Sequence, residues 1–132
     1  MKVIKKIGGI ILKDQKMLVV RKRGTDAYIM PGGKPKGDET HQETLERELN
    51  EELNLFPSSF KYFGNFQEKS MFENADVNMC IYFVDVKGEM KPDSEIVELK
   101  WIDSGYKNEG IKLGSVIEKR TLPVLIKRGL VK

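Results

Sequence analysis

Residues 33–55, GKPKGDETHQETLERELNEELNL, carry the strongest pattern in the chain. Leucines recur at every fourth position, at Leu45, Leu49 and Leu53, which predicts a helix that packs one face against a core. Turn-forming residues precede the leucines and predict a loop, and the helix must end before Pro57. The stretch therefore predicts a loop followed by one amphipathic helix.

Three carboxylates lie along one edge of this predicted helix. At about 100° per residue, Glu48, Glu51 and Glu52 fall in one sector beside the leucines. Like charges at these spacings repel each other, and more strongly when they are partly buried, so a compensating cation is a natural partner. Carboxylates without Cys or His favour Mg²⁺ or Mn²⁺. Acidic triplets are also common on solvated helix faces, and the spacing alone leaves both interpretations open.

The whole stretch resembles the signature of the Nudix hydrolase family. That signature is Gly, five residues, Glu, seven residues, and then Arg-Glu-hydrophobic-any-Glu-Glu-any-Gly-hydrophobic. Gly33, Glu39 and Arg47 occupy its first three fixed positions, and the carboxylates and Leu55 follow in place. Asn54 stands where the family has Gly. Because Asn tolerates the left-handed backbone conformation, this departure affects helix termination more than catalysis.

The resemblance implies the fold. A length of 132 residues fits one domain, so residues 1–132 are predicted to form a single Nudix domain with its signature box at 33–55. The family fold is an α/β (α+β) sandwich of the α/β/α type, in which a mixed sheet has a helix on each face.

The remaining elements follow from local patterns. Apolar and β-branched runs predict strands at residues 3–12, 17–23, 60–67, 77–86 and 98–102, and the first two are expected to pair as a hairpin. The box helix is expected to be capped by Asp38 or Thr40. A second helix is predicted over residues 115–128, with Ser115 as its cap and Gly129 as its stop, and Pro123 must kink or divide it.

The resemblance also implies a metal site. In Nudix hydrolases the carboxylates that match Glu48, Glu51 and Glu52 bind the catalytic divalent ions, Mg²⁺ or Mn²⁺, and the backbone carbonyl at the Gly33 position sometimes helps. Some relatives place a further metal-binding Glu where this chain has Glu95, although an exposed loop carboxylate is an equally good interpretation there. For the general base, Glu48 ranks first and Glu95 second.

Positioning and substrate-binding roles complete the implied site. Glu39 and Arg47 are expected to hold the loop against the helix through an ion pair or hydrogen bonds, without touching the substrate. Arg23 and Lys34 are the candidates for binding the substrate phosphates, because basic side chains form charge-assisted bonds to phosphate oxygens. Arg21 is a weaker candidate.

The implied reaction is attack of a metal-activated water on phosphorus in a nucleoside diphosphate linked to another moiety, for example a (d)NTP or a related nucleotide. The chain would then be a pyrophosphohydrolase with a small-molecule substrate. A non-catalytic nucleotide-binding or protein-interaction module on the same fold is the alternative, although such members typically lose a box carboxylate. An isomerase of prenyl diphosphates is less well supported, because the single cysteine, Cys80, lies inside a strand.

Recognition of the rest of the substrate is less well defined. Phe66, Met71 and Phe72 are candidates for stacking on a base, but aromatic and Met residues in strands and loops more often form the core or cover it. Relatives that act on oxidised guanine nucleotides use an amide side chain before the last helix, and residues 112–116 contain no Asn or Gln.

Composition excludes several classes of protein. The net charge of +3 is too small to argue for nucleic acid, and basic residues such as Lys5 and Lys6 are expected to be solvated surface. No apolar run approaches the roughly 20 residues of a membrane helix, and the amino end lacks a signal-peptide pattern, so the cytoplasm is the expected compartment. A single cysteine excludes an internal disulfide. The sequence leaves monomer and homodimer open.

Overall fold

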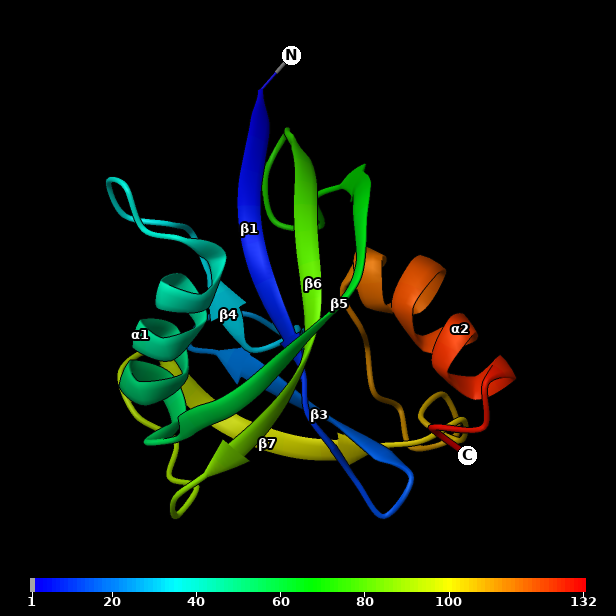
Figure 1. Cartoon of the computed structure of the whole chain (residues 1–132). Helices are drawn as coiled ribbons and strands as arrows, with labels where there is room; N and C mark the ends of the chain where they lie inside the picture. The colour runs from blue at the N-terminus through cyan, green and yellow to red at the C-terminus, as the bar shows by residue number, and fades with distance from the viewer. Residues whose placement is uncertain (1) are drawn as a thin grey trace.

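The computed structural model describes residues 2–132 and places helices on opposite sides of two β-sheets (Figure 1). The strands are β1 (Val3–Ile10), β2 (Leu12–Lys13), β3 (Lys16–Lys22), β4 (Gly32–Gly33), β5 (Phe56–Lys69), β6 (Asp76–Lys87) and β7 (Ile96–Ile102). The helices are α1 (His41–Leu53), the π-helix η1 (Ile117–Thr121) and α2 (Leu122–Lys127). The predicted α/β class, with a helix on each side of mixed strands, is confirmed.

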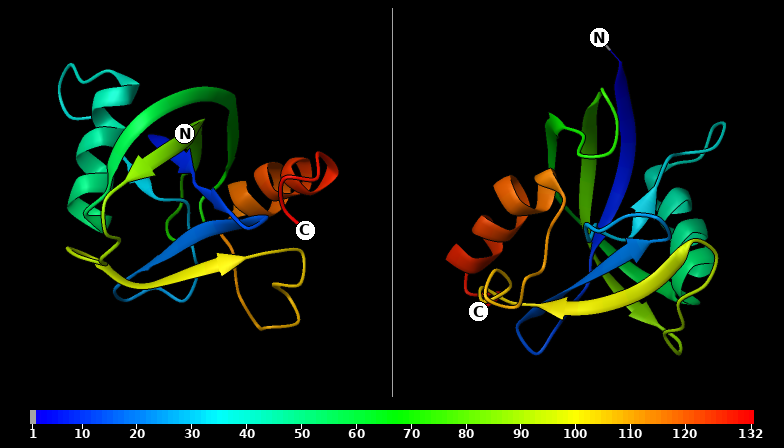
Figure 2. Two further views of the ribbon diagram at one scale, coloured as in Figure 1. Left: turned by 60° about the horizontal axis from the view of Figure 1, so that its bottom comes forward. Right: turned by 180° about the vertical axis from the view of Figure 1, so that it is seen from behind.

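The larger sheet is mixed and the smaller one is antiparallel. The larger sheet has four strands in the order β4-β1-β6-β5, in which β1 and β6 are parallel and the other pairs are antiparallel. The second sheet has the order β2-β3-β7, and Figure 2 shows it from two further sides. The short strand β4 pairs with the middle of β1, with Gly33 opposite Ile7 and Gly32 opposite Gly8. This pairing fixes the loop that precedes α1.

The predicted hairpin of residues 3–12 with 17–23 is wrong for most of its length. Only β2 pairs with β3, around a turn in which Asp14 and Gln15 have φ values of 52° and 60°. The longer strand β1 pairs with β6 in the other sheet, and β3 pairs with β7. Residues 7–11 and 17–20 of these runs are buried on both faces, so their patterns show burial but do not specify a partner.

Two hydrophobic clusters explain why these strands are apolar on both faces. Met17 and Val19 of β3 belong to the cluster beneath α2, whereas Leu18 and Val20 belong to the cluster beneath α1. Alternate side chains of one strand therefore fill two cores. Cys80 of β6 is buried in the cluster beneath α1, as expected.

Helix α1 has the predicted limits and a complete amino-terminal cap. The Thr40 hydroxyl accepts a hydrogen bond from the Glu43 N–H, and the Glu43 carboxylate accepts one from the Thr40 N–H. At the other end Asn54 adopts the left-handed conformation at φ 58°, as predicted for the position where the family has Gly.

The carboxyl-terminal helix is divided, as Pro123 predicts. A π-helical turn, η1, precedes α2, and Pro123 lies in the first turn of α2, where its missing N–H is tolerated. Gly129 stops the helix at φ 74°. The expected cap is wrong, because the Ser115 hydroxyl donates to the carbonyl of Lys69 instead. No helix within residues 2–132 is long and apolar enough to cross a membrane.

Candidate active site

The two glycines of β4 let the box helix approach the sheet closely. Gly32 has φ 140°, and a Cβ there would collide with the carbonyl oxygen of Ile7. A Cβ on Gly33 would lie 2.5 Å from Cδ of Glu48. The Glu48 carboxylate therefore lies directly against the Gly33 backbone, in space that only a glycine leaves free.

Arg47 and Glu39 connect the loop to the helix, as predicted. Arg47 Nε and Nη2 donate to the two carboxylate oxygens of Glu39 over 2.7 and 2.9 Å. The hydrogen bonds from Arg47, together with one from the Lys36 N–H, lower the pKa of Glu39 to about 2. Glu39 also accepts from the Thr44 hydroxyl, and Arg47 donates to the carbonyl of Lys34 over 3.0 Å. The loop that leads into α1 is thus fixed to the helix by one forked ion pair.

Arg47 also relieves repulsion among the box carboxylates. Its Nη1 donates to Glu48 Oε1 over 2.8 Å and lies 3.5 Å from Glu51 Oε2. The hydrogen bonds that Arg47 donates to Glu39 and Glu48 raise the pKa of Arg47, which stays charged. Among residues 2–132, no three His, Cys, Asp or Glu side chains converge in an arrangement that would hold a metal ion. The predicted metal site therefore stays a prediction, and Arg47 is the cation that Glu48 and Glu51 contact.

Glu52 differs from the other box carboxylates because it is buried. Its side chain is 5% exposed, and Oε1 accepts a hydrogen bond from the Gly32 N–H over 3.2 Å. Burial raises its pKa to about 7, and the negative charges of Glu48 and Glu95 contribute in the same direction. The Gly32 hydrogen bond and Lys22 act in the opposite direction without offsetting the burial. Glu52 is thus a carboxylate whose negative charge lacks full compensation.

The further predicted metal ligand, Glu95, and the predicted phosphate ligands, Arg23 and Lys34, are exposed. The Glu95 carboxylate lies 3.6 Å from the Lys22 ammonium. The Arg23 N–H donates to the carbonyl of Glu95. The guanidinium of Arg21, the weaker candidate for phosphate binding, donates a hydrogen bond to Glu98 over 3.0 Å. Arg21 therefore already has an anionic partner within the protein.

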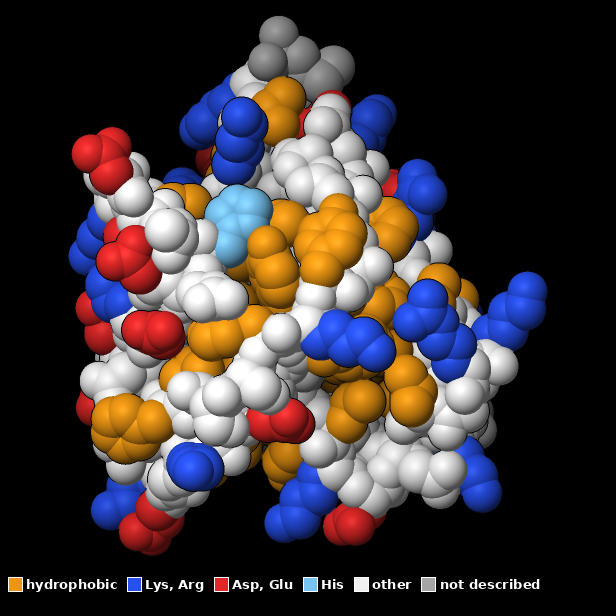
Figure 3. Space-filling view, viewed as in Figure 1, with side chains coloured by type: hydrophobic (Ala, Val, Ile, Leu, Met, Phe, Trp, Pro, Cys, Tyr) orange, Lys and Arg blue, Asp and Glu red, His pale blue; other side chains and the backbone are white. Residues whose placement is uncertain are grey.

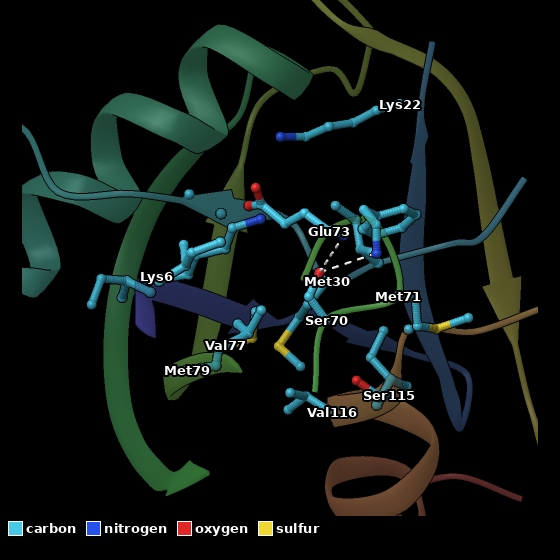
Figure 4. Close-up of a pocket in the computed structure, with 18 residues that line it drawn as sticks. Lys6, Lys22, Met30, Ser70, Met71, Glu73, Val77, Met79, Ser115 and Val116 are labelled. Carbon is cyan, nitrogen blue, oxygen red and sulfur yellow. Dashed lines mark hydrogen bonds between the residues drawn. The ribbon is translucent and has the colours of Figure 1, made fainter. Parts of the chain in front are cut away.

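A pocket opens on the side of β4 that faces away from α1. Gly32 and Gly33 form one wall, and η1 and the loop between β5 and β6 form others (Figure 4). Met30 and Met79 provide apolar lining, and the charged side chains include Lys6 and Lys22. The predicted phosphate ligands Arg23 and Lys34 do not line it.

Lys6 is the pocket residue that sequence reasoning missed. It was expected to be solvated surface, together with Lys5. The available signal was its position: Lys6 lies on the same face of β1 as Ile4 and Gly8, which are buried. A lysine on that face must point towards a polar space inside the fold.

The three residues considered for base stacking separate in the structure. Phe66 packs with Phe63 at a ring distance of 5.9 Å beside the core, whereas Met71 and Phe72 line the pocket and remain partly exposed. His41 lies on another part of the surface, among hydrophobic side chains (Figure 3). Its Nδ1 is 2.8 Å from the Tyr82 hydroxyl.

Comparison with known proteins identifies the family. The model of the NUDIX domain matches residues 4–104, which include all the box residues and most of the pocket. The chain belongs to the Nudix family. The pocket residues of the carboxyl-terminal helical segment, such as Ser115 and Val116, lie beyond the matched part of the Nudix domain.

Relatives and solved structures agree with this assignment. The chain is 28% identical over 101 residues to an ADP-ribose pyrophosphatase of Methanocaldococcus jannaschii, covering 74% of this chain and 60% of the relative. It is 31% identical over 80 residues to an 8-oxo-dGTP diphosphatase of Escherichia coli, covering 57% of this chain and 59% of the relative. The matches thus span about three fifths of either curated relative. The solution structure of the E. coli ORF135 protein superposes with a TM-score of 0.74 at 25% identity, covering 96% of this chain and 91% of that one.

Proposed function

We propose that this Nudix protein is a Mg²⁺- or Mn²⁺-dependent hydrolase that cleaves the diphosphate linkage of a nucleoside diphosphate linked to another moiety, such as a (d)NTP or a related nucleotide. One observation carries the proposal: Gly32 and Gly33 separate the box carboxylates from an apolar pocket that also contains lysines. A nucleoside in the pocket would therefore extend its phosphates towards the carboxylates. We expect the reaction to take place in the cytoplasm.

The names of the two curated relatives are compatible with this substrate class. One is an ADP-ribose pyrophosphatase and the other an 8-oxo-dGTP diphosphatase. Both names describe cleavage next to a nucleoside phosphate, with different groups on the far side.

The residues present suit a divalent metal, which members of the family typically use. Glu48, Glu51 and Glu52 supply oxygen ligands alone, the donor set that Mg²⁺ and Mn²⁺ prefer. Glu52 supports this role most directly, because it is buried, accepts one hydrogen bond from the Gly32 backbone and has an elevated pKa. Glu48 and Glu51 would exchange part of their contact with Arg47 for the ion.

A bound divalent ion would polarise the phosphoryl oxygens, lower the pKa of a water molecule and orient the diphosphate. The protein supplies the rest of the chemistry. Glu48 is our first candidate for the base that accepts the proton from water, and the more exposed Glu95 is the second. Arg47 and Glu39 keep the carboxylates in position, and Lys22 neutralises charge at the pocket end of the site.

A substrate panel tests the proposal. Nucleoside triphosphates, oxidised dGTP, ADP-ribose, dinucleoside polyphosphates and nucleotide sugars are incubated with Mg²⁺, Mn²⁺ or EDTA, and kcat/KM is compared. We expect metal-dependent cleavage of at least one of them, its loss in Glu51→Gln, and its retention in Glu46→Gln. Glu46 is a matched control, since it is an exposed glutamate on the same helix. Saturable nucleotide binding without any product would instead favour a non-catalytic binding module.

A further inference from the structure

Lys6 is a lysine with an unusual environment. It lies in the middle of β1, is only partly exposed and faces the pocket, whereas its neighbour Lys5 is exposed. Within residues 2–132 its ammonium group forms no salt bridge and no hydrogen bond. Burying an ammonium group without a partner is costly, so this position calls for an anion.

The surroundings of Lys6 are rich in positive charge. Lys22 lines the same pocket, and Lys34 lies close enough to act on Lys6 through its charge. Burial lowers the pKa of Lys6, and the repulsion from these two lysines lowers it further. The attraction of Glu52 and Glu73 does not offset this effect. An anionic ligand would therefore relieve repulsion as well as satisfy the Lys6 ammonium.

Glu73 is an acidic residue that lines the same pocket as Lys6. In Figure 4 the Lys6 side chain points towards the Glu73 carboxylate. The loop between β5 and β6 carries Glu73, and the Ser70 hydroxyl accepts hydrogen bonds from two backbone N–H groups of that loop. The Glu73 carboxylate pairs with Lys2 over 3.5 Å and is half exposed. It therefore approaches Lys6 from a surface loop that other contacts hold in place.

We propose that Lys6 binds the phosphate chain of the substrate and that Glu73 occupies the place of that anion in the free protein, so that Glu73 competes with phosphate for Lys6. The proposal rests on the proposed function for the identity of the natural ligand, but it concerns a binding step that needs neither metal nor turnover. The chemical class of the ligand is a diphosphate or longer polyphosphate anion. Phosphate binding at Lys6 would connect the pocket to the carboxylates across Gly32 and Gly33.

The first test measures binding of inorganic pyrophosphate to the whole protein in EDTA by calorimetry. We expect Lys6→Met to weaken binding about tenfold, the usual effect of losing a hydrogen bond to a charged group. Lys5→Met removes the same charge from the adjacent, exposed position and should bind as the wild type does. Equal affinities of Lys6→Met and the wild type would overturn the proposal.

The second test removes the competing anion. Glu73→Gln should tighten pyrophosphate binding about threefold, because one negative charge near the anion is lost. Lys2→Met breaks the other contact of Glu73 and leaves its charge in place, so it should not tighten binding. Weaker binding in Glu73→Gln would contradict competition.

A third outcome would assign Lys6 and Glu73 to recognition of the nucleotide base instead of the phosphates. In that case both variants would change the ratio of kcat/KM between purine and pyrimidine nucleotides while pyrophosphate binding stayed constant, and the proposal would fail. Failure of the proposed function looks different: the wild type would hydrolyse no member of the panel, yet the pyrophosphate affinities would still follow Lys6 and Glu73.

Discussion

The two sides of β4 are built in different ways. On the α1 side, Arg47 donates hydrogen bonds to Glu39, Glu48 and the Lys34 carbonyl. The ion pairs with Arg47 orient the Glu39 and Glu48 side chains. On the pocket side, flexible methionines and a surface loop form the walls, and the charged Lys6 has no hydrogen-bonded partner among the described residues. The first arrangement is rigid and the second is adaptable.

We propose that this difference separates chemistry from recognition. Carboxylates that hold a metal must be preorganised, and an Arg–carboxylate network provides fixed geometry. A pocket lined by methionine fits ligands of different shape, because the side chain is unbranched and polarisable. We therefore expect changes on the α1 side to reduce kcat, and changes on the pocket side to alter affinity and substrate preference.

The largest effect is expected from the buried carboxylate. Glu52→Gln keeps the shape and the acceptor for the Gly32 N–H, but it removes a charge that we assign to metal binding. Turnover should fall by about a thousandfold or more while the circular dichroism spectrum is unchanged. Kinetics with a saturating substrate and Mg²⁺ measure this, with Glu46→Gln beside it. Full turnover in Glu52→Gln would remove Glu52 from the chemistry.

The next effect concerns the fork of Arg47. Arg47→Lys retains the charge but cannot bond both oxygens of Glu39 while also reaching Glu48. We expect kcat to fall by about ten- to a hundredfold with little change in KM, as for other residues that orient metal ligands. Arg128→Lys, at the exposed end of α2, is the matched control. A change in KM alone would place Arg47 in substrate binding instead.

The two glycines of β4 should separate stability from activity. Gly32→Ala introduces a clash with the Ile7 carbonyl at a φ value that alanine disfavours, so it should lower the free energy of unfolding by about 1–3 kcal/mol. Gly33→Ala meets only the end of the Glu48 side chain, which can move, so it should retain the fold but reduce kcat about tenfold. Urea unfolding and steady-state kinetics of both variants distinguish the two effects. Equal losses of stability would show that Gly33 is a structural residue.

Outside catalysis, Glu52 should also give the metal-free protein a pH dependence of stability. Because the pKa of Glu52 rises from 4.5 to about 7 on folding, the folded state binds more protons between these values. Stability therefore falls as pH rises through this window, by an amount of the order of 3 kcal/mol, and stays low above pH 7. Glu52→Gln should lack this fall and melt at a higher temperature than the wild type at pH 8. If the melting temperatures of the wild type and Glu52→Gln changed in parallel from pH 4.5 to 8, the result would contradict the burial assigned to Glu52.

The α1 side could be predicted from the sequence because its determinants are local. One short segment contains all of them: the leucine period, the Thr40 cap, the left-handed Asn54 and the pair Glu39–Arg47. The pocket could not be predicted in the same way. Lys6 meets its neighbours only after β1, β3, η1 and the loop between β5 and β6 come together.

The strand pairing failed for a related reason. Residues 7–11 and 17–20 contribute side chains to both hydrophobic clusters, so alternation gave no information about their partners. Their short connection suggested a hairpin, whereas the chain changes sheets between β1 and β2. The left-handed turn at Asp14 and Gln15 specified only the pairing of β2 with the start of β3.

The most direct measurement is a Mn²⁺ titration followed by electron paramagnetic resonance, without substrate, on the wild type, Glu52→Gln and Glu46→Gln. We expect saturable Mn²⁺ binding by the wild type and by Glu46→Gln, and at least about tenfold weaker binding by Glu52→Gln. Indistinguishable Mn²⁺ affinities of the wild type and Glu52→Gln would contradict a metal site at the box carboxylates.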